Sequence, residues 1–230
     1  MISLGAGTAT ADTVRIDSIV DGWQNAVGGG WTTFIDNDPN PGTDRLRWGL
    51  PITLFGPQSG YDWNSKNTPF DVTTDTKFSL GEFTHHNNPI TAGTALTSVD
   101  LAFAVGNFEN PTNLSATFKF THDETPNNKP CGFPSQSTCD DFVEITNTFF
   151  NAAIVDNGGK SYYFTLLGFS TDNGQTTSTV FQTREGKENT AKLYAIITSA
   201  PISTPDGGAT VALLGGALMG LGVLRRRMNI

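Results

Sequence analysis

Three histidines, His85, His86 and His122, are the side chains that most directly suggest chemistry, because imidazole nitrogens commonly ligate zinc. Their positions lack the H-x-x-x-H and H-E-x-x-H spacings that place two ligands on one helix face. Neighbouring residues of a strand point to opposite faces of the sheet. On a strand, at most one of His85 and His86 can therefore join His122 in a site.

A structural role is the alternative for the first histidine pair. The segment 79–83 has the pattern of a strand, and polar residues follow it directly. In this interpretation Thr84, His85 and Asn87 satisfy backbone groups in a turn after that strand. The pattern favours this role over a zinc site.

Four oxygen-bearing side chains flank a short segment closed by two cysteines: Glu124, Asn127, Asp140 and Asp141. Calcium takes six to eight oxygen ligands and tolerates irregular loops. For a metal, the sequence therefore favours calcium at these four residues. No D-x-D-x-D-G pattern fixes their spacing, and ordinary surface acids in turns are the alternative.

The cysteines themselves are Cys131 and Cys139, with proline and glycine around them. In an exported protein, a close and even pair predicts a disulfide that closes a loop. A redox pair would more often have the spacing C-x-x-C, and two cysteines alone make a poor metal site.

Enzymatic chemistry has weak support. The acidic pairs Asp123/Glu124 and Asp140/Asp141 could serve a glycosidase, which needs two carboxyl groups about 5 to 9 Å apart. The sequence has neither a G-x-S-x-G elbow nor a glycine-rich phosphate loop. We assign no catalytic residue and expect no cofactor other than calcium.

The elements that must position these residues follow a period of two. Apolar and polar residues alternate in four segments, which predicts half-buried strands at 99–105, 116–120, 162–166 and 191–197. Turn sequences stand between them at 156–159, 172–174 and 185–187. The N-terminal third contains all four tryptophans, and we expect more loop there. The fold class predicted is all-β, an antiparallel β-sandwich of jelly-roll type, with one C-terminal hydrophobic helix.

The two ends of the chain differ from the middle. Residues 1–11 are small and apolar and end in an A-x-A cleavage form, so we interpret them as the remnant of a signal peptide. The β domain then covers 12–200. Residues 201–230 form a tail with Pro205, Asp206, Gly207 and Gly208, an apolar helix at 209–224, and a basic stop of Arg225, Arg226 and Arg227. Sixteen helical residues span about 24 Å, against a hydrocarbon core of roughly 30 Å, so permanent spanning is marginal.

The net charge of the domain limits the kinds of partner that it can bind. Between residues 12 and 205 there are 11 Lys and Arg against 21 Asp and Glu, a net charge of −10. Such a surface repels phosphates and anionic membranes, which argues against nucleic acid as a partner. The three tail arginines favour the cytoplasmic side, which leaves the preceding domain outside.

The tail resembles the PEP-CTERM family of sorting signals, in the variety that begins Val-Pro-Asp-Ser-Gly; here the first position is Thr204 and the fourth is Gly207. The resemblance implies a bacterial protein exported by the general secretion route and cleaved near the motif by an exosortase. It also implies that the helix is a transient anchor in the inner membrane before the protein reaches the cell surface or extracellular matrix.

The body resembles the THxN family of PEP-CTERM proteins in residues 46–49 and 80–90, which include the Thr84-His85-x-Asn87 motif. It also resembles the related choice-of-anchor domains. The residues 124–127, the two cysteines, Glu185 and Asn189 fall at further recurrent positions. The resemblance implies a non-enzymatic surface or matrix protein connected with extracellular polysaccharide or biofilm. A carbohydrate- or calcium-binding module is the alternative.

Overall fold

The computed structural model describes residues 11–36, 42–106, 114–147, 152–155 and 160–200. Strands and turns make up these residues, and every strand pairing is antiparallel. The all-β, antiparallel class predicted from the sequence is confirmed, and the jelly-roll-like topology stays a prediction. The described residues contain no helix long and apolar enough to cross a membrane; the predicted helix at 209–224, the rest of the tail and residues 1–10 lie outside them.

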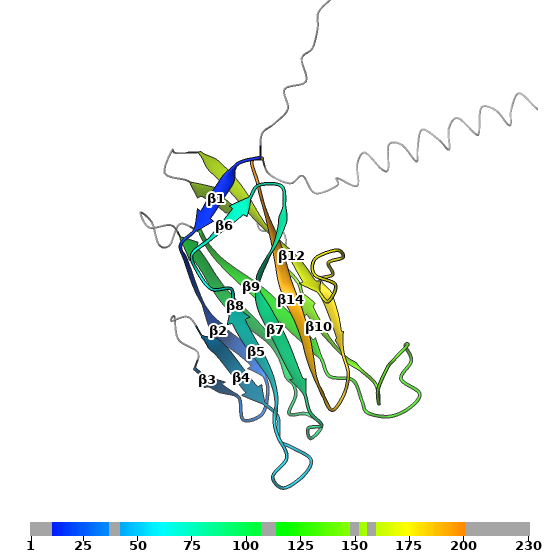
Figure 1. Ribbon diagram of the computed structural model, residues 1–230. Helices are drawn as coiled ribbons and strands as arrows, with labels where there is room; N and C mark the ends of the chain where they lie inside the picture. The colour runs from blue at the N-terminus through cyan, green and yellow to red at the C-terminus, as the bar shows by residue number, and fades with distance from the viewer. Residues whose placement is uncertain (1–10, 37–41, 107–113, 148–151, 156–159, 201–230) are drawn as a thin grey trace, which may run out of the picture. The chain divides into compact units, whose positions relative to one another are not determined.

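Two large sheets form the body (Figure 1). The seven-stranded sheet has the order β11-β12-β14-β7-β5-β4-β3, and the five-stranded sheet has the order β13-β10-β9-β8-β2. The first consists of β11 (Ala152–Val155), β12 (Ser161–Ser170), β14 (Lys187–Thr198), β7 (Lys77–Asn87), β5 (Ser59–Ser65), β4 (Thr43–Trp48) and β3 (Thr33–Ile35). The second consists of β13 (Val180–Thr183), β10 (Asp141–Ile145), β9 (Leu114–Asp123), β8 (Leu96–Gly106) and β2 (Ser18–Gly28). A small sheet pairs β1 (Thr13–Ile16) with β6 (Phe70–Thr73).

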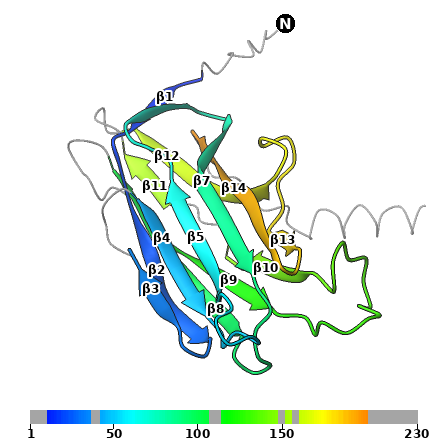
Figure 2. The same ribbon diagram turned by 60° about the horizontal axis from the view of Figure 1, so that its bottom comes forward.

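The two large sheets lie face to face as two layers (Figure 2), and their inner faces share one hydrophobic core. Aromatic side chains meet across the gap: Trp23 of β2 lies 5.7 Å from Tyr61 of β5, and Phe83 of β7 stacks 5.6 Å from Phe120 of β9, measured between ring centroids. Such aromatic pairs add about 0.5–1.5 kcal/mol each beyond the area that they bury. The four alternating segments lie in β8, β9, β12 and β14, as predicted.

The N-terminal third is richer in strands than expected. Residues 13–73 contain β1 to β6, and Trp23, Trp48 and Trp63 are almost completely buried. Trp31, by contrast, is 74% exposed. Strand β4 alternates inward Leu46 and Trp48 with outward arginines. The prediction of loop was wrong because charged residues on the outer face hid short alternating strands.

Candidate functional site

The Thr84-His85-x-Asn87 segment lies inside β7, not in a turn after a strand that ends at residue 83. It pairs on both sides, with β5 and with β14, so the ladder already satisfies the backbone groups. His85 and Asn87 point inward and are fully buried, whereas Thr84 and His86 lie half-buried on the outer face. The expectation that His85 and His86 point to opposite faces is confirmed, and the turn expected at Thr84, His85 and Asn87 was wrong.

His85 offers an unpaired nitrogen to the interior. Its Nδ1 lies 2.8 Å from Oγ1 of Thr183, and that hydroxyl donates to the carbonyl of Asp141 at 3.3 Å. Thr183 therefore accepts from Nδ1–H, and this tautomer leaves a lone pair on Nε2. The Nε2 atom is buried and has no hydrogen-bond partner within the described residues. Burial, with smaller contributions from the other histidines, holds the pKa of His85 well below its usual value, so the ring is neutral.

His122 reaches the same place from the opposite sheet. It lies on β9, and its ring centroid is 5.1 Å from that of His85. Its Nδ1 is 2.7 Å from the hydroxyl of Tyr61, and its Nε2 is 3.3 Å from Oε2 of Glu124. Burial lowers the pKa of His122 to about 4, against the opposing charge of Asp141. The ring is thus neutral near pH 7 and able to share a lone pair.

Three carboxyl groups, Glu124, Asp141 and Glu185, surround the histidines. One atom each from His122, Glu124 and Asp141 lie within 4.8 Å of one another. Oδ1 of Asp141 accepts from the backbone N–H of Thr125 at 2.8 Å. Its Oδ2 and both carboxyl oxygens of Glu185 are buried without a hydrogen-bond partner among the described residues.

Burial also dominates the electrostatics of these acids. The pKa of each is raised to about 7, mainly by burial, and the negative charge of Glu124 contributes to the raised values of Asp141 and Glu185. The described salt bridges of lysine and arginine all involve other acids. We call this group the inter-sheet cluster: His85, Asn87, His122, Glu124, Asp141, Thr183 and Glu185.

The four residues predicted to bind calcium do not form one group. Glu124 and Asp141 meet in the inter-sheet cluster. Asp140 turns into the cysteine loop, where its carboxylate accepts from the Gln136 backbone at 2.9 Å and from Gln182 at 2.8 Å. Burial would raise the pKa of Asp140, but these and neighbouring hydrogen bonds lower it. Asn127 is exposed, and the proximity of its amide to Glu185 opposes the raised pKa of that acid.

The cysteine loop supports the cluster from outside. Cys131 and Cys139 form a disulfide with their Cα atoms 5.2 Å apart, and Cys139 is buried. Inside the loop, Ser137 accepts a hydrogen bond from the backbone N–H of Glu185 at 2.8 Å. The next residue, Gly186, donates its N–H to the carbonyl of Asn87 at 2.7 Å. The loop and the end of β7 thus fix the turn that carries Glu185.

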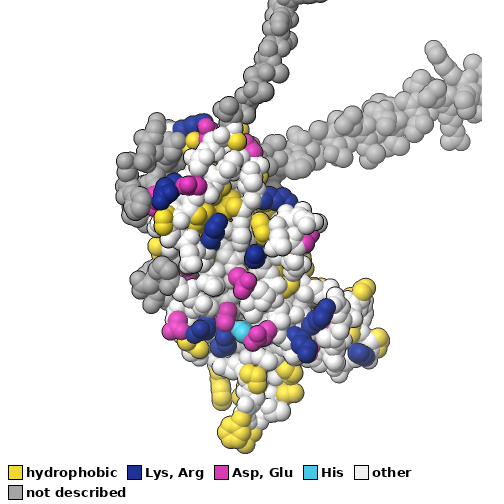
Figure 3. Space-filling view, in the orientation of Figure 1, with side chains coloured by type: hydrophobic (Ala, Val, Ile, Leu, Met, Phe, Trp, Pro, Cys, Tyr) yellow, Lys and Arg dark blue, Asp and Glu magenta, His cyan; other side chains and the backbone are white. Residues whose placement is uncertain are grey.

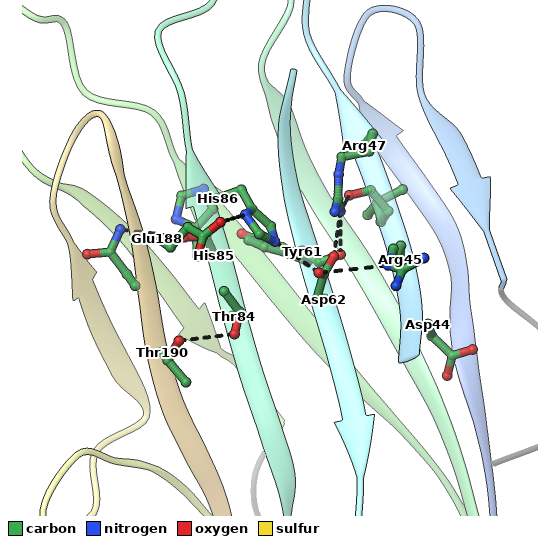
Figure 4. Close-up of polar contacts among 12 residues, drawn as sticks. Asp44, Arg45, Arg47, Tyr61, Asp62, Thr84, His85, His86, Glu188 and Thr190 are labelled. Carbon is green, nitrogen blue, oxygen red and sulfur yellow. Dashed lines mark hydrogen bonds and ion pairs between the residues drawn. The ribbon is translucent and has the colours of Figure 1, made fainter. Parts of the chain in front are cut away.

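A second polar group lies on the outer face of the seven-stranded sheet (Figure 4). Asp62 accepts from Arg47 at 2.6 Å and contacts His86 at 2.9 Å. Burial would raise the pKa of Asp62, but the hydrogen bonds of His86 and Arg47 outweigh it and lower the pKa. A shallow pocket of about 360 Å³ adjoins this group, lined by Arg47, Pro57, Gln58, His86, Asn88, Gly186, Lys187 and Glu188. Figure 3 shows the charged side chains gathered around one histidine on this face.

An apolar loop projects at one end of the same face, visible as the hydrophobic lower end in Figure 3. It connects β4 and β5, and Ile52, Leu54 and Phe55 are 64%, 83% and 99% exposed. Strand β5 begins beside the end of β7, because Gly60 pairs with His86. The loop, the shallow pocket and the inter-sheet cluster therefore lie at the same end of the domain.

Comparison with known families identifies the tail and assigns no family to the β domain. Residues 205–228 match a family model described as the VPDSG-CTERM motif. No curated protein is significantly similar to the chain. The motif indicates an exported protein that a CTERM system sorts to the cell surface, with processing by a sorting protein of the exosortase kind.

Sequence reasoning named most of the cluster without assembling it. It considered His85 and His122, placed Glu124 and Asp141 together, and noted Glu185 only as a family position. Thr183 and Tyr61 were missed, since a lone threonine or tyrosine on an alternating strand has no distinctive pattern. The sequence signal that could have revealed the cluster is the presence of polar residues at the core-facing positions of a strand, as at His85 and Asn87.

Proposed function

We propose that this chain is a non-enzymatic bacterial surface or matrix protein that an exosortase cleaves and that associates with extracellular polysaccharide or biofilm. The observation that carries the proposal is the sorting motif at 205–228. Sorting signals of this kind act on exported proteins. The acidic composition of the preceding domain is compatible with an exterior location and argues against binding to nucleic acid.

The tail supplies the physical basis of sorting. In this proposal the apolar segment at 209–224 enters the membrane, and the basic stop at 225–227 holds the end on the cytoplasmic side. Because the segment falls short of the hydrocarbon thickness, the anchor in the inner membrane is transient and ends with cleavage near Pro205. The β domain at 12–200 is then released or transferred, having lost the signal remnant at 1–11.

Membership of the THxN family, with the related choice-of-anchor domains, is part of the same proposal. The residues of the motif have structural roles on both faces of β7. His85 and Asn87 face the interior, and the hydroxyl oxygen of Thr84 lies 3.1 Å from that of Thr190 on β14. Such a motif stabilises a surface domain without requiring a reaction.

The replacement of Pro205 and Asp206 by alanine tests sorting. We expect the double variant to remain membrane-bound and uncut, while the wild type yields a mature form without Arg225, Arg226 and Arg227. Intact mass spectrometry of the exported and membrane fractions measures this. The matched control replaces Glu144, an exposed acid of β10, with alanine, which removes one acid outside the motif. A mature wild type that retains the three arginines would refute cleavage.

A carbohydrate-binding module is the second candidate, favoured by the shallow pocket on the outer face. Gln58 lines that pocket and donates to the backbone carbonyl of Trp31 at 3.1 Å, and Trp31 is itself exposed. Sugars bind sites that combine such partners. A glycan array with the exported protein tests it: saturable binding that Trp31→Ala abolishes supports the module, and the absence of binding favours a structural role.

A further inference from the structure

We propose that the inter-sheet cluster is a binding site for one divalent transition-metal ion such as zinc, held by Nε2 of His122 and the carboxylates of Glu124 and Asp141, with His85 completing the shell. The three primary ligand atoms lie within 4.8 Å of one another, and two of them are already 3.3 Å apart. Ligand atoms about 2.0–2.2 Å from a tetrahedral ion are separated by roughly 3.3–3.6 Å. Closing the site requires the Asp141 carboxylate to approach the other two ligand atoms.

Buried acceptors without donors are the independent evidence for a cation. The side chains of His85, Asn87 and Asp141 are fully buried, and each leaves one acceptor atom, Nε2, Oδ1 and Oδ2 respectively, without a hydrogen bond within the described residues. A buried acceptor that is left unsatisfied destabilises the folded state. A cation bound by His85 and Asp141 supplies what those two atoms lack, whereas a further acceptor would not.

The arrangement of the two imidazole rings fits a shared ion. A ligating ring places its centroid about 3.2 Å from zinc, so two rings at a tetrahedral angle have centroids about 5.2 Å apart. The centroids of His85 and His122 are 5.1 Å apart, with their planes at 87°. The two rings come from opposite sheets, so the spacing reflects tertiary packing and not a local motif.

Outer partners already orient both rings for binding through Nε2. Nδ1 of His85 donates to Thr183, and Nδ1 of His122 contacts the hydroxyl of Tyr61. Ligating histidines usually hold their second nitrogen in this way, which fixes the tautomer and the ring orientation. The backbone N–H of Thr125 fixes Asp141 similarly.

The choice of metal follows from the ligand atoms. Calcium and magnesium prefer oxygen alone, whereas imidazole together with carboxylate suits zinc and other first-row divalent ions. The surroundings also fit a cation, because the described salt bridges provide no lysine or arginine partner for Glu124, Asp141 or Glu185. The ion would join β7 of one sheet to β9 and β10 of the other.

Metal titration of the purified exported protein, stripped with EDTA, tests the site. We expect one zinc ion per chain by elemental analysis, and a higher Tm with zinc than with calcium. Glu124→Gln and Asp141→Asn should each weaken zinc binding by more than the about 10- to 100-fold that loss of an outer partner costs. Glu144→Gln is the matched control, because Glu144 lies on β10 but points to solvent; its affinity should equal that of the wild type.

Each outcome decides the proposal. A stripped wild type that takes up no stoichiometric zinc overturns it, as does equal binding by Glu124→Gln and the wild type. Calcium that raises Tm where zinc does not also overturns it and assigns the cluster to oxygen-only coordination. The side chain of Glu124 is 18% exposed, so Glu124→Gln tests the site even if Asp141→Asn does not fold.

Discussion

Removal of the Tyr61 hydroxyl isolates one contact of the inter-sheet cluster. Tyr61 is fully buried, and its hydroxyl lies 2.7 Å from Nδ1 of His122. Burial, chiefly, raises the pKa of Tyr61 well above its usual value, so the hydroxyl keeps its proton at neutral pH. In Tyr61→Phe the ring packing survives, but the imidazole nitrogen loses its only described partner. The expected cost is about 1–3 kcal/mol of unfolding free energy.

Thermal and urea unfolding of the metal-free protein measure this cost. In a domain of this size, each kcal/mol shifts Tm by about 2–4 °C, so Tm should fall by roughly 2–12 °C. The control Tyr163→Phe removes a hydroxyl from the half-exposed Tyr163 on β12 and should stay within about 0.5 kcal/mol of the wild type. A Tyr61→Phe variant as stable as the wild type would refute the view that this hydroxyl satisfies His122.

Two further substitutions test other parts of the core. Burial raises the pKa of Asp21 above its ordinary 3.8, so this group's contribution to the free energy of unfolding is fully present below pH 3.8 and is lost as pH rises through the folded pKa. Asp21→Asn keeps an acceptor for Trp63, and its stability relative to the wild type should increase over that pH range in urea unfolding at several pH values. Gly168→Ala should cost roughly 2–4 kcal/mol, because φ is +110° and a Cβ would lie 2.3 Å from the Ser178 carbonyl oxygen, while Gly93→Ala, with a similar φ but open space, should cost about 1 kcal/mol in the same assay.

The alternation of apolar and polar residues predicted the strands well where every inward residue is apolar and every outward residue is polar. In β9 the residues Phe118 and Phe120 are buried while Lys119 faces out, so a period of two is visible in the letters alone. The strand nevertheless continues to Asp123, because His122 occupies the inward phase and has partners in other strands. Polar inward residues broke the pattern, and the same effect ended the predicted strand early at Phe83.

The cluster required tertiary information that a single sequence does not contain. His85 meets Thr183, 98 positions away, because β7 and β13 belong to different sheets that pack together. The acids nearest one another in sequence separate, since Asp140 and Asp141 point to different surroundings. The acids that meet, Glu124 and Asp141, are joined through β9 and β10 pairing. Sequence proximity was therefore a poor guide to the ligand set.

The direction of β14 fixes which end of the β domain carries residue 200 and which end carries the inter-sheet cluster. Ile196 pairs with Lys77 at the start of β7, while Lys187 pairs with Asn87 at the other end. Eleven residues of extended chain span about 33 Å. The apolar loop between β4 and β5 and the inter-sheet cluster therefore lie about one strand length away from the C-terminal end of β14. Within the described residues, the exposed side chains of Ile52, Leu54 and Phe55 are thus kept well apart from residue 200.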